Sequence, residues 1–245
     1  MLTIRENLLE TIRGGKPDRY VNQFEFMATI QNPFSATNPG PKPGQGPVVN
    51  KWGITRVWPE GTPGPFPIHD EAHIVCPDVT KWRDVVHAPN VVYSDEEWAP
   101  FLEKAKTVDR SRQFVTHYVA PGIFEQCHYL MEIQNCLINF YEEPEAMHEL
   151  IDYLTEWELH YAEEVCSHLK PEALFHHDDW GSQQSTFLSP EMFKEFYLPA
   201  YKKVYGYYRD HGVQLIIHHS DSYAATLVPF MIEMGVDIWQ GVMRT

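Results

Sequence analysis

The chain has 245 residues, of which 43% are hydrophobic and 13% aromatic, enough for a sizeable globular core. Thirty-four acidic residues against 19 basic ones give a formal net charge of −15. Binding to nucleic acids and to anionic membranes both depend on Lys and Arg, so this dispersed excess of acid argues against either partner.

The N-terminus and the cysteines show none of the patterns typical of a secreted protein. The N-terminus carries acid early and has no apolar stretch typical of a signal peptide, and no apolar run approaches the ~20 residues of a membrane span. No two cysteines form a Cys-x-x-Cys pair, which argues against a disulfide framework and a zinc ribbon. We therefore expect a cytoplasmic chain with four buried free thiols: Cys76, Cys127, Cys136 and Cys166.

The first third of the chain is irregular. Residues 3–13 predict an amphipathic helix with a capping box, and residues 21–30 predict a strand of mixed faces. Residues 31–67 are rich in Pro and Gly but too aromatic for a disordered linker. We expect a long packed excursion there, with a small hairpin at 48–57, that covers a pocket.

The remainder alternates between helical and strand patterns. The alternation favours a parallel sheet with crossover helices, and strands that stay apolar until a polar end are typical of a TIM-type (β/α)8 barrel. A closed barrel needs eight strands, and we find about six, so the expectation is a single α/β domain over 1–245 with a C-terminally incomplete barrel. The expected strands are 114–120, 173–177, 213–218 and 236–242, and the expected helices are 77–86, 94–106, 123–141, 144–168, 189–211 and 223–234.

Two of these strands carry the clearest functional signal. Each ends in two histidines followed by acid, in the sequences LFHHDDWG and LIIHHSDS. Because side chains alternate along a strand, His177 and Asp179 share one face, and so do His219 and Asp221. Metal ligands and proton-transferring groups of α/β enzymes lie at such strand ends.

His219 and Asp221 are spaced as two metal ligands one strand period apart. Imidazole and carboxylate suit zinc, and a catalytic zinc keeps an open position. The alternative is a histidine that binds a carboxylate and only orients the strand end. The tandem His218-His219 also predicts that one ring faces the barrel and the other faces a helix, with His218 the other candidate for contact with substrate.

The first strand end offers a general acid or base, or a clamp for substrate. Of Asp178 and Asp179, only one needs to face the pocket, and a polar strand end or a helix cap would explain both residues equally well. His177 is the adjacent candidate. The following loop, with Trp180 and Gln183, is able to approach a ligand, or is an ordinary turn.

Other candidates come from earlier elements. Tyr118 ends a strand, and Glu125 enters the site from the next loop or merely favours a helix dipole. Glu25 reaches the mouth from the first strand, or is a solvated acid. No Gly-x-Gly-x-x-Gly, no phosphate-binding loop with Lys and no Gly-x-Ser-x-Gly is present, which disfavours nucleotide cofactors and serine-hydrolase chemistry.

Four segments resemble the uroporphyrinogen decarboxylase superfamily. They are APGIFE at 120–125, HDDWGSQ at 177–183, LSPEMF at 188–193 with Leu198-Pro199, and IHHSD at 217–221 leading to MGVD at 234–237. The superfamily includes the decarboxylase of tetrapyrrole synthesis and the cobalamin- or corrinoid-linked methyltransferases. The resemblance implies a (β/α)8 barrel with its site at the strand C-termini, and often a homodimer.

The chain also departs from both branches. The decarboxylase holds its polycarboxylate substrate with an Arg-Gln-x-Gly-Arg motif, whereas the first strand here reads QFEFMA, without arginine. The methyltransferases use a His-x-Cys zinc motif. If His219 is the equivalent histidine, Asp221 stands in place of the cysteine; if His218 is, Ser220 does. Family members continue through two more strand–helix units, and we expect this chain to lack them.

The resemblance is closer to the methyltransferase-like branch. It implies transfer of a methyl group between a small methylated donor and a thiol or a corrinoid protein, assisted by zinc. The alternatives are a cofactor-free decarboxylase of porphyrin biosynthesis and a non-catalytic binding protein. In the first hypothesis the zinc ligands are His219 and Asp221 with His177 as a possible third, and the contacts to substrate come from Asp178, Asp179 and Gln183.

Overall fold

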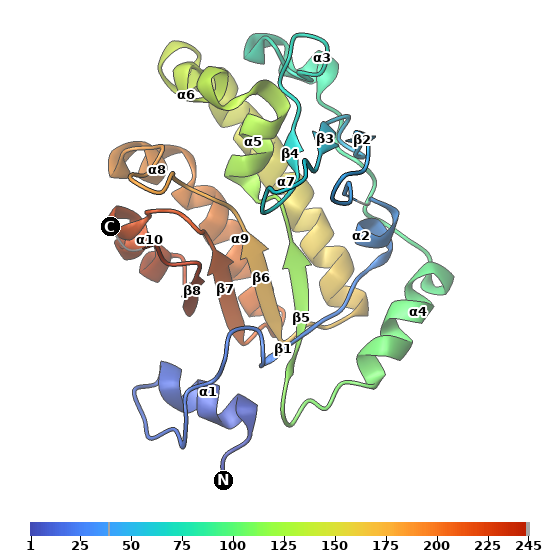
Figure 1. The fold of residues 1–245 in the computed structure, drawn as a ribbon, viewed down its shortest axis with the longest axis vertical. Coiled ribbons are helices and arrows are strands. Elements are labelled where there is room, and N and C mark those ends of the chain that lie inside the picture. Colours follow the sequence, from blue (N-terminus) through green and yellow to red (C-terminus); the bar gives the residue numbers. More distant parts are fainter. Residues whose placement is uncertain (39, 244–245) are drawn as a thin grey trace.

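A five-stranded parallel sheet forms the centre of the computed structural model, which describes residues 1–38 and 40–243. In this sheet each strand pairs with the next one along the chain, in the order β1-β5-β6-β7-β8 (Figure 1). Such sequential winding is that of a TIM-type barrel, which confirms the predicted α/β class. Within the described residues β1 and β8 are the edges. The strands are β1 (Met27–Thr29), β5 (Phe114–Val119), β6 (Ala173–His177), β7 (Leu215–His219) and β8 (Ile238–Gln240).

Helices cover one face of the sheet. The two longest, α7 and α9, pack against each other and on the strands, as Figure 1 shows. The helices are α1 (Ile4–Ile12), α2 (Pro33–Thr37), α3 (Trp82–Val85), α4 (Asp95–Lys106), α5 (Ile123–Met131), α6 (Ile133–Glu142), α7 (Pro144–His168), α8 (Pro190–Phe196), α9 (Leu198–Asp210) and α10 (Val228–Glu233). Short 3-10 turns at Val79–Lys81 and Ala225–Leu227 precede α3 and α10.

The opposite face of the sheet has a smaller core of its own. Alternate residues of the strands, such as Phe114, Phe175 and Ile217, pack there with Leu8 of α1 and with Phe26. These side chains point to the inside of the curved sheet because successive residues of a strand face opposite sides. The strands are therefore buried on both faces until their C-terminal ends, which is why polar residues there stand out in the sequence.

A second, antiparallel sheet lies beside the C-terminal ends of the main strands (Figure 1). It consists of β2 (Val48–Val49), β3 (Thr55–Val57) and β4 (Phe66–Pro67). The structure thus places the hairpin expected within residues 31–67 at β2 and β3, and adds β4 on the other side of β3.

Several expected elements are shorter or divided. The strand expected over 21–30 starts only at Met27, since the chain turns at Phe24 with a φ of 64°. The helix expected over 123–141 is two helices, because Glu132 adopts a φ of 76° and its carboxylate then caps α6. The helix expected over 189–211 is divided at Tyr197, and α9 begins at Leu198 with Pro199 in its first turn.

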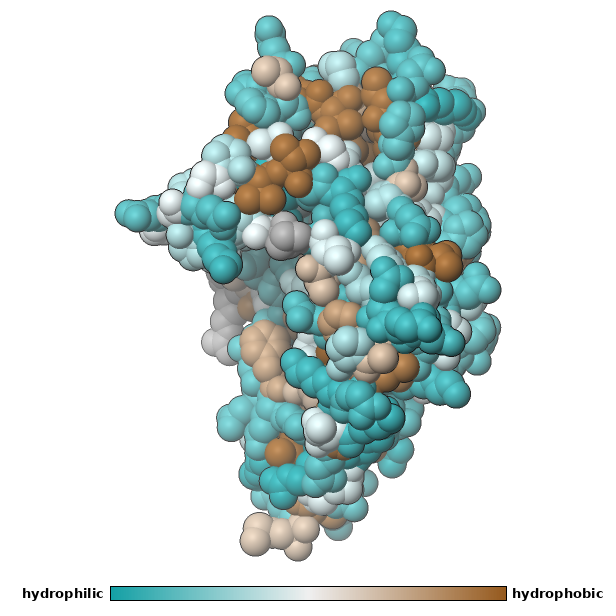
Figure 2. All heavy atoms as spheres, turned by 90° about the vertical axis from the view of Figure 1, so that its right-hand side faces the viewer, coloured by the Kyte–Doolittle hydropathy of each residue, from teal (hydrophilic) through white to brown (hydrophobic). Residues whose placement is uncertain are grey.

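The side of the molecule that bears α2 and α4 is mainly hydrophilic, with its apolar side chains in separate groups (Figure 2). None of the helices in residues 1–38 and 40–243 is both long and apolar enough to cross a membrane. Within the same ranges all four cysteines are buried free thiols, as predicted.

Candidate functional site

A cavity of about 650 Å³ opens at the C-terminal ends of the strands. Its wall consists of the excursion 31–67, the ends of β5 and β6, and residues of α5 and α7. A second hollow of about 530 Å³ adjoins it, and the two linings share Thr29, Pro63, Tyr118, His177 and Asp221. The pocket expected beneath the excursion therefore exists, and the two predicted strand ends meet at its wall.

Three metal-capable side chains converge where the two hollows meet. One ligand atom each of His177, Asp179 and His219 lies within 4.8 Å of the other two. Nε2 of His219 is 3.9 Å from Oδ1 of Asp179, and the rings of His177 and His219 stack at 4.3 Å. The parallel register that sets His177 beside His219 brings the two histidines together.

Hydrogen bonds fix the tautomers of both histidines. Nδ1–H of His177 donates to the buried carboxylate of Glu125 at 2.9 Å, and Nδ1–H of His219 donates to the side-chain oxygen of Gln240. Each neutral ring then carries its lone pair on Nε2, which is available to a ligand. A carboxylate or amide oxygen behind an imidazole is the usual support of a metal-binding histidine.

The pKa values follow from burial and from Glu125. Burial lowers the pKa of His177, but the hydrogen bond to Glu125 and the negative charge of that carboxylate outweigh burial and raise the pKa to about 9. Burial raises the pKa of Asp179 to about 7, and the charge of Glu125 adds to the rise. Burial lowers the pKa of His219, which keeps this ring in the neutral form.

The group of three fits a divalent metal with nitrogen and oxygen ligands. Two ligand atoms around a tetrahedral zinc lie about 3.3 Å apart, so these ligand atoms, which lie within 4.8 Å of one another, must move closer together to hold the metal. Asp221 is outside the group: its backbone N–H donates to Oδ1 of Asp179 at 2.9 Å, and its carboxylate lines the cavity. The arrangement thus favours Asp179, in place of Asp221, as the carboxylate ligand beside His219.

The neighbours of these residues point the other way, into the helix layer. Nε2–H of His176 donates to Glu158 of α7 at 2.7 Å. His218 is fully buried, accepts a hydrogen bond from the Tyr205 hydroxyl and donates to the backbone oxygen of Asp178. The prediction that one ring of His218-His219 faces a helix is confirmed, and His218 has no access to a substrate.

Asp178 holds the loop and helix that carry Glu125. Its buried carboxylate accepts the backbone N–H groups of Phe124 and Glu125 at 3.0 and 2.8 Å, at the start of α5, and also the hydroxyl of Tyr201. It lines neither cavity. We expected Asp178 to be catalytic; its position makes it a positioning residue, the helix cap that was the alternative from sequence.

Gly122 lies directly against this cap, and it provides a stability test. A Cβ at Gly122 would lie 2.4 Å from Oδ2 of Asp178, whereas a Cβ at Gly206 of α9 would meet nothing. Gly122→Ala should therefore lower the free energy of unfolding by about 1–3 kcal/mol through overpacking. Gly206→Ala, the matched control, should raise it by about 1 kcal/mol. Denaturant unfolding of both variants measures the difference, and an equal effect would contradict the close approach.

Three other predicted residues lie outside the cavities. Glu25 precedes β1, at the opposite end of the strand from the site, and pairs with Arg19 at 2.5 Å. Trp180 is buried and stacks on the ring of His218 at 3.7 Å, so its role is packing. Gln183 is exposed in the following loop. By contrast, Tyr118 and Glu125 line the main cavity, as predicted for both.

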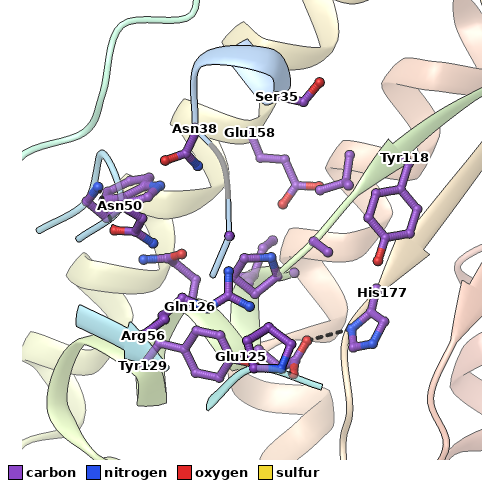
Figure 3. A pocket seen from close by; sticks show the side chains of 18 of the residues that line it. Ser35, Asn38, Asn50, Arg56, Tyr118, Glu125, Gln126, Tyr129, Glu158 and His177 are labelled. Carbon is purple, nitrogen blue, oxygen red and sulfur yellow. Dashed lines mark hydrogen bonds and ion pairs between the residues drawn. The ribbon is translucent and has the colours of Figure 1, made fainter. Parts of the chain in front are cut away.

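Sequence reasoning missed the residues on the far side of the cavity. Arg56 of β3, together with Gln126 and Tyr129 of α5, lines it there, as Figure 3 shows. Figure 3 also shows His177 across from them, with Glu125 between Tyr129 and His177 and joined to His177 by a hydrogen bond. Gln126 and Tyr129 follow Glu125 within two turns of helix, which was the one available signal.

Comparison with known proteins agrees with this architecture. Residues 81–241 match the model of the uroporphyrinogen decarboxylase (URO-D) family. The chain belongs to the uroporphyrinogen decarboxylase family. The matched range includes β5 to β8, and therefore every residue of the histidine and carboxylate group.

A solved structure with a different activity has a similar fold. A methyltransferase from Methanosarcina mazei has a similar structure, with a TM-score of 0.62 and 13% sequence identity. The similarity covers 98% of this chain and 76% of that one. At this identity the likeness shows the fold alone. A search of curated proteins finds no match.

Proposed function

We propose that this chain is a methyl-transferring enzyme, which moves a methyl group between a small methylated donor and a thiol or a corrinoid carrier. The observation that carries the proposal is the group of His177, Asp179 and His219 at the cavity wall, with Nδ1 of each ring engaged by a protein oxygen so that Nε2 is the nitrogen left for a metal. The structural likeness to a methyltransferase supports it.

Zinc is the metal that we propose for this group, with His177, Asp179 and His219 as the residues that hold it. When bound, it supplies Lewis-acid chemistry that lowers the pKa of a thiol. Glu125 and Gln240 keep the two rings oriented through their Nδ1–H groups. The exposed carboxylate of Asp221 lines the cavity next to Asp179 and is placed to accept a proton from the thiol.

The charges of the cavity favour this reaction over decarboxylation of uroporphyrinogen. Among its described lining residues there is one Lys or Arg, Arg56, against four carboxylates: Glu125, Glu158, Asp179 and Asp221. The imidazole of His177, which also lines the cavity, already pairs with Glu125. A polycarboxylate substrate needs several cations, because each buried carboxylate must be paired. The first strand also supplies no arginine.

An anaerobic assay with methylcobalamin and 2-mercaptoethanol tests the proposal. The zinc-loaded protein should transfer the cobalt-bound methyl group to the thiolate sulfur, which yields the methyl thioether and cob(I)alamin. The visible absorbance of the corrinoid and mass spectrometry of the thioether follow both products. A rate equal to that without protein, under conditions where methylcobalamin binds, would favour a non-catalytic binding protein; release of CO2 from uroporphyrinogen would favour the decarboxylase. Either result would refute the proposal.

A further inference from the structure

Arg56 is unusual among the arginines of this chain. It is the one Lys or Arg that lines the main cavity within the described residues, and it enters from β3 of the covering sheet. It forms no ion pair with any residue that the structure describes, and its buried Nε–H has no acceptor there. A buried donor without an acceptor costs free energy, and a ligand that supplies an acceptor would remove this cost.

Gln126 presents a second donor of the same kind. Its side chain is only 5% exposed, it lines the same cavity from α5, and its Nε2 atom has no partner among the described residues. Tyr129 contacts both Arg56 and Glu125. Its ring lies 5.8 Å from Cζ of Arg56, and its hydroxyl donates a hydrogen bond to Glu125 at 3.1 Å. In Figure 3, Arg56, Gln126 and Tyr129 lie on the side of the cavity away from His177.

No carboxylate among the described lining residues accepts a hydrogen bond from Arg56 or Gln126. Glu125 and Glu158 accept hydrogen bonds from His177 and His176, at 2.9 and 2.7 Å. Asp179 follows β6, and Asp221 follows β7 on the side of the proposed metal group. The cavity thus has one end with unused donors and another end with carboxylates and imidazoles.

We propose that Arg56 and Gln126 bind a carboxylate of the substrate, so that the thiol or methylated substrate is a small monocarboxylate. The planar fork of a guanidinium matches a carboxylate, and the amide N–H of Gln126 adds a further donor. A single carboxylate binds at this end while the uncharged end of the same molecule reaches the group at His177, whose neighbouring acids would repel a second carboxylate. The assignment of the reacting group rests on the proposed methyl transfer; carboxylate binding by Arg56 does not.

Titration calorimetry with 3-mercaptopropionate and 3-mercapto-1-propanol tests this inference, because the two thiols differ mainly in the carboxylate. The protein should bind the carboxylate at least about tenfold more tightly than the alcohol. Arg56→Gln should remove this preference, and Arg56→Lys should retain part of it, since it keeps the charge and loses the fork. Arg13→Gln, on the exposed end of α1, is the matched control and should leave the preference intact.

The same titration on chelator-treated protein separates this inference from the proposed function. A preference for the carboxylate that persists without metal, and disappears in Arg56→Gln, supports the binding role even if no methyl transfer is found. Gln126→Leu removes the second donor at nearly constant volume and should weaken the preference severalfold. This variant tests the inference if Arg56→Gln does not fold. Equal affinity of the protein for both thiols, or an unchanged preference in both variants, would overturn the inference.

Discussion

Replacing His219 by alanine should lower the zinc affinity of the protein by at least about 100-fold. Loss of a hydrogen-bonding group behind a metal ligand already costs about 10–100-fold, and here the ligand itself is removed. Metal analysis of the purified protein and competition with a chromophoric chelator measure the change. His160→Ala, on the exposed side of α7, is the matched control and should retain the zinc of the parent chain. Zinc bound equally by both variants would exclude His219 as a ligand.

The same competition should show a defined dependence on pH. Below its pKa of about 9, His177 carries a proton that zinc must displace, and below about 7 Asp179 carries another. Zinc affinity should therefore rise with pH, by about tenfold per pH unit between 7 and 9 and more steeply below 7. An affinity that does not change between pH 6 and 9 would mean that neither group is a ligand.

Asp178→Ala is expected to produce the largest loss of stability of any single change near the site. It removes the cap of α5 and leaves the hydroxyl of Tyr201 and two backbone N–H groups buried without an acceptor. The expected cost is about 3 kcal/mol, or a decrease in Tm of about 6–12 °C. Thermal unfolding followed by circular dichroism measures it.

A surface acid provides the comparison for Asp178. Asp152 lies on the exposed face of α7, and Asp152→Ala should change Tm by no more than about 2 °C. If Asp178→Ala were equally mild, the carboxylate would not hold α5, and the positioning role that we assign to it would be wrong.

The part of the site that lies on strands could be predicted from the sequence. The two-residue period of a strand placed His177 and Asp179 on one face and predicted that one of His218 and His219 faces a helix, and both results hold in the structure. It did not tell which of the two histidines would face the helix, and His218, which we expected to contact substrate, is the one that does. The choice between Asp179 and Asp221 could not be made in the same way. Both residues follow the last residue of a strand, so the loop conformation, and not the period, decides which carboxylate meets His219.

The features that the sequence did not predict depend on long-range packing or on unusual backbone conformations. Arg56 enters the cavity because the small antiparallel sheet docks over the strand ends, and no local pattern encodes that docking. The division of the helix after Met131 depends on a positive φ at Glu132, a residue that rarely adopts one. By contrast, the long helix α7 and strand β6 match their predicted ranges because each is a strongly patterned segment with a clear start.

At the ends of β6 and β7, alternate side chains face the cavity and the helices in turn. His177, Asp179 and His219 face the cavity, while His176, Asp178 and His218 anchor the same few residues to α5, α7 and α9. A substitution on the inward face therefore changes the set of available ligands without loosening the backbone that presents them. We therefore expect the inward positions to accept different side chains at little cost in folding, because the outward residues hold the backbone in place.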